Sequence, residues 1–204
     1  MSEFDEKAAT WDDYPDRIKR AEVIASRLAS AVNLTVIKTA MEYGSGTGLM
    51  SFALKDDIRE ITLMDDSAEM TKVARQKIID QKVTNLIAVH GDLLKGPLRN
   101  ERFDFIFIVL TLHHIGDVEE LLRKFHNLLS PKGQLAIIDL EKEDGSFHDD
   151  PFHGHKGFER SDLENRLNYA GFVPAYYEVC YHIEKETEKG IREYPVFLMV
   201  AEKK

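Results

Sequence analysis

Short apolar runs alternate with helical patterns from residue 38 onward, and this alternation constrains the fold more than any other feature. Strands that alternate with helices favour a parallel, doubly wound α/β sheet whose crossovers are right-handed. Strands are predicted at 38–43, 60–64, 86–90, 103–110 and 134–140. Helices are predicted at 16–32 and 49–55, after Ser67, through the apolar positions from Val118 to Leu129, and between Ser161 and Gly171. Pro131 and Gly133 are expected to end the fourth of these helices.

The last two predicted strands, 172–183 and 196–201, break the alternation. Only about a dozen residues separate them, mostly charged and without helical periodicity, so the two strands are expected to form an antiparallel hairpin at the sheet edge. The length of 204 residues indicates one domain. We divide it into an N-terminal cap segment and helix at 1–33, an α/β core at 38–204, and a lid-like loop at 141–158.

Charge and composition narrow the class of partner. The chain has 36 acidic and 27 basic residues and a net charge of −9, which argues against a nucleic acid or an anionic membrane as the main partner. A single cysteine, Cys180, excludes a disulfide framework and is expected to be a small buried residue. The longest apolar runs have six residues and the acidic N-terminus has no apolar stretch, so the expected protein is soluble and cytoplasmic. The oligomeric state is left open.

A glycine-rich loop, residues 42–48, lies between the first predicted strand and helix. Glycines there permit a positive φ and a close approach to a ligand, which favours a nucleotide-type ligand over a merely tight turn. Leu49 stands where the dinucleotide fingerprint requires glycine, and Tyr43 stands where a hydrolase nucleophile elbow requires it.

Acidic residues follow the next two strands. Asp65 and Asp66 end the second strand, where a carboxylate can accept both hydroxyls of a ribose, although an aspartate beside Ser67 could instead cap a helix. Asp92 follows the third strand and could accept from an adenine amino group, with Leu93 or Leu94 covering the ring, or could serve only a turn.

These segments together resemble the successive motifs of class I S-adenosylmethionine-dependent methyltransferases. The resemblance rests on residues 42–48, 65–70, 91–93, 103–104 and 110–114, and it covers roughly residues 38 to 204. It implies a Rossmann-like seven-stranded sheet of order 3-2-1-4-5-7-6 with strand 7 antiparallel, and S-adenosyl-L-methionine as the cofactor.

The resemblance also implies roles for individual residues. The glycine loop would lie against the methionine and ribose parts, Glu42 near the methionine ammonium, Asp65 on the ribose and Asp92 on the adenine amino group. Asp66 stands where the family often has an apolar residue that covers adenine. The cofactor-binding candidates are Glu42, Gly44, Ser45, Gly46, Gly48, Asp65, Asp66, Asp92, Leu93 and Leu110.

Histidines and aromatics gather on the expected acceptor side. His113 and His114 follow the fourth strand, and the loop 141–158 leaves the fifth strand with three histidines among three phenylalanines. A neutral histidine is a competent proton acceptor, so His113 is the catalytic candidate, although either ring of the pair could instead shape the backbone. The substrate-binding candidates are Trp11, Tyr14, His114, His148 and His155.

A metal site is an alternative reading of the same loop. His153 and His155 with Asp149 and Asp150 have suitable ligand types, but nothing in the spacing fixes a third ligand in rigid geometry. We therefore expect no metal.

The sequence favours an S-adenosylmethionine-dependent methyltransferase acting on a small molecule. A nicotinamide-dependent oxidoreductase and a non-catalytic binding module that keeps the cofactor fold remain as alternatives.

Overall fold

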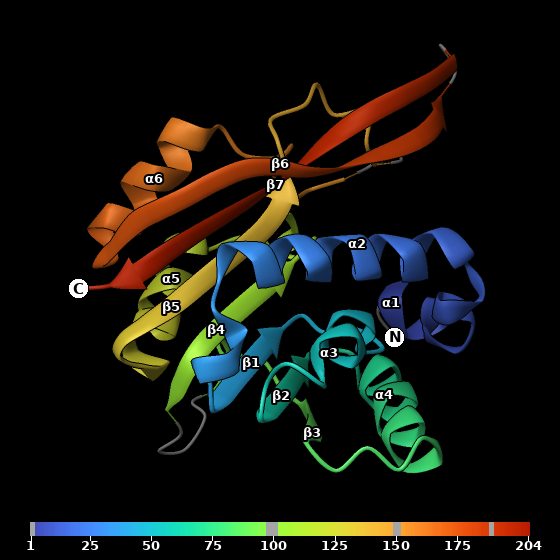
Figure 1. Ribbon diagram of the computed structural model, residues 1–204. Coiled ribbons are helices and arrows are strands. Elements are labelled where there is room, and N and C mark those ends of the chain that lie inside the picture. Colours follow the sequence, from blue (N-terminus) through green and yellow to red (C-terminus); the bar gives the residue numbers. More distant parts are fainter. Residues whose placement is uncertain (1–2, 97–101, 149–151, 188–189) are drawn as a thin grey trace.

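The computed structural model contains one seven-stranded sheet of order β3-β2-β1-β4-β5-β7-β6 (Figure 1). It describes residues 3–96, 102–148, 152–187 and 190–204. The first five strands pair in parallel, and β7 is antiparallel to both β5 and β6. The predicted fold class and strand order are therefore confirmed. The strands are β1 Thr39–Tyr43, β2 Glu60–Asp65, β3 Leu86–His90, β4 Phe103–Val109, β5 Leu129–Leu140, β6 Phe172–Thr187 and β7 Gly190–Lys203.

Helices cover both faces of this sheet. Along β4, Phe105 and Phe107 pack with α2, α3 and α4, whereas Ile106 and Ile108 pack with α5 and α6. This strand is buried on both faces, as its continuous apolar sequence predicts. The helices are α1 Glu3–Lys7, α2 Pro15–Ala31, α3 Leu49–Leu54, α4 Ala68–Asp80, α5 Val118–Leu128 and α6 Arg160–Tyr169, with short 3-10 turns η1 Ala8–Asp13, η2 Leu34–Val36 and η3 Leu112–His114.

Two predicted boundaries are wrong. β5 begins at Leu129 rather than at residue 134. Phe103 of β4 pairs with Leu129 and Phe105 pairs with Gln134, so this irregular register includes the expected turn residues 130–133 in the strand. Ser161 does not cap α6, which begins one residue earlier after Glu159 and has no side-chain cap. Two fully buried leucines, Leu163 and Leu167, hold that helix against the sheet instead.

The terminal hairpin is longer than predicted. β6 continues to Thr187 and β7 starts at Gly190, so the charged residues expected to connect the strands pair with each other instead. These charges are compatible with strand pairing because the hairpin extends beyond the helices that cover the rest of the sheet (Figure 1). Cys180 is buried in β6, as predicted.

The helices of the described segments include none long and apolar enough to cross a membrane.

The parallel strands place the loops that follow them at one edge of the sheet. Strands β1 to β5 run in the same direction, so the segments that follow them meet at one carboxyl-terminal edge.

The central strand sets the stability of this arrangement. Phe107 is fully buried and stacks on Phe105 with ring centroids 5.6 Å apart. Phe107→Ala should lower the free energy of unfolding by about 3–5 kcal/mol, because it leaves a cavity that the packed faces cannot refill. Ile191→Ala, at a position 77% exposed on the hairpin, is the matched control and should change stability by less than ~0.5 kcal/mol. Urea titration measures both, and equal losses would contradict a core centred on β4.

Candidate functional site

The glycine loop, Asp65 and Asp92 meet at the carboxyl-terminal edge. The backbone N–H groups of Gly44 and Ser45 both donate to the carbonyl of Met64, at 2.8 and 3.1 Å. The N–H of Gly91 donates to the carbonyl of Asp65 at 2.9 Å. Hydrogen bonds between successive loops thus bring together the segments in which sequence reasoning placed the cofactor.

The three glycines of the loop have different surroundings. Gly44, Gly46 and Gly48 all have positive φ. A β-carbon at Gly44 would lie 2.2 Å from Thr111, and one at Gly48 would lie 2.5 Å from Leu63. At Gly46 the nearest atom is the sulfur of Met70, at 3.9 Å. Gly44 and Gly48 therefore permit close packing within the protein, whereas Gly46 has open space in front of it.

The backbone N–H groups of Gly44, Ser45, Gly46 and Gly48 already donate hydrogen bonds within the protein. The N–H of Gly46 donates to Oδ2 of Asp65 at 2.6 Å, and that of Gly48 donates to the carbonyl of Ser45 at 2.8 Å. A pyrophosphate site instead needs backbone N–H groups that point at the ligand. These loop N–H groups are therefore not free to bind a pyrophosphate.

The two neighbouring aspartates are physically distinct. Asp65 is buried, and its second oxygen accepts from the N–H of Ser67 at 2.9 Å. Burial raises the pKa of Asp65. The carboxylate of Asp66 is exposed and lies 3.7 Å from Lys95. Asp65 therefore faces the glycine loop while Asp66 faces solvent, and Ser67 caps α4 by accepting from the N–H of Met70.

Glu42 is a buried acid without a cationic hydrogen-bond partner among the contacts described. It is 3% exposed, and Oε2 accepts from the N–H and the hydroxyl of Ser51 at 3.0 and 2.5 Å. Burial raises the pKa of Glu42 to about 8, against these two hydrogen bonds. The group is therefore mostly protonated at neutral pH, and an ammonium placed beside it would favour its ionised form.

Asp92 is held by three donors. It accepts from the Tyr43 hydroxyl at 2.7 Å and the Leu94 N–H at 2.8 Å, and lies 3.1 Å from Lys95. Although burial acts in the other direction, these groups keep the pKa of Asp92 below its ordinary value. Leu93 is buried in the core, whereas Leu94 is half-buried, so Leu94 is better placed to cover a bound ring.

Three of the predicted histidines form a cluster beside the end of β4. The ring centroids of His113 and His114 are 4.2 Å apart, and His148 lies 5.0 and 5.2 Å from them. His113 is buried, and its Nδ1 lies 2.6 Å from Oδ1 of Asp139, a fully buried residue of β5. The N–H of His113 also donates to Oδ2 of Asp139 at 3.1 Å. Asp139 was missed by sequence reasoning, since its position inside a buried strand was the only available signal.

Two members of the cluster, His114 and His148, are uncharged near pH 7. Burial, and after it the nearby His113 and His148, lowers the pKa of His114 to about 4. Burial, followed by His113 and Lys185, lowers the pKa of His148 to about 4.

Leu110 was expected to touch the cofactor, and the structure places it at the end of β4 with a φ of 48°. A leucine in this left-handed region is strained, and its N–H donates to the carbonyl of Ile138 at 2.8 Å. Strain of this kind clusters at functional sites, and it turns the chain from β4 into η3 with its two histidines.

Hydrogen bonds attach the described parts of the loop 141–158 to β5 and to the turn that carries His113. Its base is closed by an isolated bridge between Glu141 and Phe158. His155 binds twice to the other side, since its N–H donates to the carbonyl of His113 at 2.7 Å and its Nε2 lies 3.0 Å from the carbonyl of Ile115. One ring nitrogen of His155 is thus used to hold the backbone, and His153 is exposed. Asp149 and Asp150 lie outside the described residues.

The N-terminal segment lies on the glycine loop. Asp12 accepts from the Thr47 hydroxyl and from Lys77, both at 2.6 Å, and Asp5 accepts from the Ser67 hydroxyl at 2.6 Å. Phe4 meets His114 edge-on at 5.3 Å. Asp5 and Asp12 were absent from the predicted site residues, and only the acidic character of this segment hinted at them.

The rings of Trp11 and Tyr14 both contact the side chain of Arg17. The guanidinium of Arg17 lies 3.9 Å from the ring centroid of Trp11 and 4.3 Å from that of Tyr14. Tyr14 is 55% exposed. Trp11 lies 6.1 Å from Phe4, which in turn contacts His114, and the substrate-binding role of Trp11 and Tyr14 stays a prediction.

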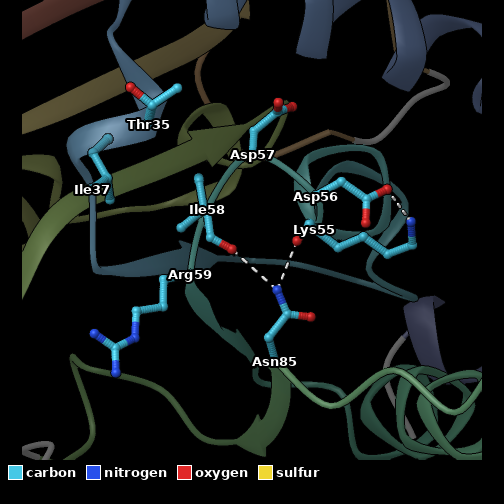
Figure 2. A pocket seen from close by; sticks show the side chains of 8 residues that line it. All are labelled: Thr35, Ile37, Lys55, Asp56, Asp57, Ile58, Arg59 and Asn85. Carbon is cyan, nitrogen blue, oxygen red and sulfur yellow. Dashed lines mark hydrogen bonds and ion pairs between the residues drawn. The ribbon is translucent and has the colours of Figure 1, made fainter.

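A surface hollow at the opposite edge of the sheet is unrelated to these groups. It is lined by Thr35, Ile37, Asn85 and residues 55–59, which precede β1, β2 and β3. Figure 2 shows the Asn85 amide donating to the carbonyls of Lys55 and Ile58, at 2.7 and 3.1 Å. The Asn85 side chain thus holds the turn at residues 55–58, and the hollow lies away from the predicted site residues.

Comparisons with known proteins agree with the geometry. Residues 41–137 match the model of a family described as methyltransferase domain. A demethylmenaquinone methyltransferase of Listeria monocytogenes serotype 4a is 32% identical over 100 residues, which cover 48% of this chain and 42% of the relative. The chain thus aligns with less than half the length of that curated relative.

Solved structures share the fold at low identity. A putative methyltransferase from Bacillus halodurans has a TM-score of 0.74 at 17% identity, covering 88% of this chain and 98% of that one. A putative sarcosine dimethylglycine methyltransferase from Galdieria sulphuraria has a TM-score of 0.70 at 16% identity, covering 91% and 85%. The chain is therefore similar to a methyltransferase domain over residues 41–137, and it shares its fold with solved structures of putative methyltransferases.

Proposed function

We propose that the chain binds S-adenosyl-L-methionine and transfers its methyl group to a small-molecule acceptor. The junction between Gly46 and Asp65 carries the proposal. Gly46 has open space in front of its Cα, and its N–H binds a buried carboxylate at 2.6 Å. A ribose diol placed there would meet the oxygen acceptors of the Asp65 carboxyl group and a backbone without a side chain.

The remaining cofactor contacts follow from the same edge. Glu42 would receive the methionine ammonium, and Asp92 would exchange Lys95 for the adenine amino group while Leu94 covers the ring. The cofactor supplies an activated methyl group, so the protein contributes orientation and electrostatics.

An acceptor that carries a proton needs a base, and His113 is placed for this task. Its Nδ1 donates to Asp139, which leaves the lone pair of Nε2 available toward the cluster. Asp139 acts as a positioning residue that fixes this tautomer and would stabilise the imidazolium. His114, His148 and the surrounding phenylalanines would form the acceptor wall. The names of two related proteins, which refer to demethylmenaquinone and to sarcosine and dimethylglycine, support a small acceptor.

The alternatives make different predictions for ligand binding. Calorimetry with S-adenosylmethionine, S-adenosylhomocysteine, NAD and NADP should show binding of the first two only. Binding of NAD or NADP alone would favour the oxidoreductase. A non-catalytic module would bind S-adenosylmethionine but transfer no labelled methyl group to any fraction of a small-metabolite extract.

Asp65→Ala should weaken S-adenosylhomocysteine binding at least about tenfold, because hydrogen bonds to a charged group contribute about 1.5–3 kcal/mol. Calorimetry measures the dissociation constant, and circular dichroism checks the fold. Asp66→Ala removes an exposed carboxylate one residue away and should have a much smaller effect. Equal losses in the two variants would contradict the assignment of the ribose to Asp65.

Gly46→Ala should abolish detectable S-adenosylhomocysteine binding, because the added methyl group enters the open space and strains a φ of 53°. Gly190→Ala is the matched control. It has a φ of 103°, no atom within 4 Å of the added carbon, and a place at the far end of the hairpin. Both variants carry backbone strain, so normal binding by Gly46→Ala would mean that the loop is only a turn.

Cofactor binding near pH 7 should release up to about one proton from Glu42. The pKa of Glu42 in the free protein is about 8, so the acid is mostly protonated there, and an adjacent ammonium lowers that pKa. Affinity should consequently rise as the pH increases toward 8. Calorimetry in buffers of different ionisation enthalpy counts the protons. In Glu42→Gln, cofactor binding should no longer release this proton. If that variant released as many protons as the wild type, the proton would not come from Glu42 and its assignment to the ammonium would be wrong.

A further inference from the structure

His113, His114 and His148 present ring nitrogens that all lie within 4.8 Å of one another. We propose that these three imidazoles form a binding site for a divalent transition-metal ion of the zinc class. Two of the ligands come from η3, at the end of β4, and the third comes from the loop 141–158. The site therefore joins a rigid turn to a long connection at the carboxyl-terminal edge of the sheet.

The donor set selects the class of ion. Imidazole nitrogens suit Zn²⁺, Co²⁺ and Ni²⁺, whereas Mg²⁺ and Ca²⁺ prefer oxygen ligands. Tetrahedral zinc binds nitrogen at about 2.0–2.1 Å, which places neighbouring ligands about 3.3 Å apart. The ligand nitrogens now lie within 4.8 Å of one another, so metal binding would draw the rings of His114 and His148 toward His113, which Asp139 holds.

Asp139 supplies the second shell that such a site requires. Its Oδ1 lies 2.6 Å from Nδ1 of His113, and it also accepts from the N–H of Leu140 at 2.7 Å. A carboxylate that accepts from one ring nitrogen leaves the other deprotonated and orients it toward the metal. In this way Asp139 directs Nε2 of His113 into the cluster.

Two buried nitrogens need a partner. Within the described parts of the chain, Nε2 of His113 and Nε2 of His148 are buried without a hydrogen bond. Buried polar atoms left in this way are costly and call for an explanation such as an ion. The rings of Phe152 and Phe147 also pack against His148, at 3.7 and 4.9 Å, and would shield a bound ion from bulk water.

This site differs from the one that spacing had suggested. His153 is exposed, and Nε2 of His155 is used by the carbonyl of Ile115. Three protein ligands leave a fourth position open, as in catalytic zinc sites. An ion there would bind an acceptor oxygen or nitrogen and lower its pKa, in place of the base role given to His113. That catalytic role, unlike the binding of the metal, rests on the proposed methyl transfer.

The test uses the full chain without an affinity tag, stripped of metal by a chelator. Titration with Co²⁺ should produce the visible absorption of a tetrahedral site at one equivalent, and Zn²⁺ should displace the Co²⁺. Mass spectrometry of metals after gel filtration should find one zinc per chain, and excess Mg²⁺ should not compete. Less than stoichiometric retention by the wild type would overturn the proposal.

Variants identify the ligands. His148→Ala and His114→Ala should lower Zn²⁺ affinity by more than about 100-fold, and Asp139→Asn should lower it by about 10–100-fold through the orientation of His113. His153→Ala, an exposed histidine of the same loop, is the control and should bind as the wild type does. Equal affinity in His148→Ala and His153→Ala would overturn the assignment. Binding of S-adenosylhomocysteine, followed in parallel, reports folding and tests the proposed function separately, because it depends on the glycine loop.

Discussion

The pairing of β4 with β1 on one side and β5 on the other determines where every functional group lies. Because β4 is buried on both faces, a one-residue slip would move its phenylalanines from the face covered by α2 to the face covered by α5. The register therefore has little freedom. It fixes the end of β1, from which the glycine loop leaves, beside the end of β4, from which the histidines leave. The side chain of Thr111 fills the space beside Gly44 and completes that contact.

The order of elements was predictable because it depends on periodicity, which a single sequence displays directly. Strands β1 to β4 lie within one residue of their predicted ends, since apolar runs and glycines delimit them. The start of β5 was not predictable in the same way. Pro131 and Gly133 normally end a strand, and only the irregular pairing with β4 keeps them inside one. The long hairpin was underestimated for a similar reason, because charged residues resemble a loop when the sheet partner is unknown.

The arrangement of the glycine loop and its aspartates was also more predictable than that of the histidine cluster. Asp65 and Gly46 belong to local motifs, and the structure joins them by one hydrogen bond. The partnership of His113 and Asp139 spans 26 residues and two strands, so no local pattern reveals it. No local pattern revealed that the guanidinium of Arg17 would lie over the rings of Trp11 and Tyr14. Long-range polar pairs of this kind depend on tertiary packing rather than on spacing in the chain.

The attachment of the N-terminal segment suggests how ligands could reach a covered site. Of α1 and η1, only Ala8 is buried, and the segment is tied to the glycine loop mainly through polar groups such as the bonds from Thr47 to Asp12 and from Ser67 to Asp5. Segments with few buried apolar contacts open at low free-energy cost. The loop 141–158, by contrast, is tied by backbone bonds to β5, η3 and its own base. Opening would therefore begin at residues 3–13, which expose the glycine loop and His114 together, while His113 and Asp139 stay fixed within the sheet.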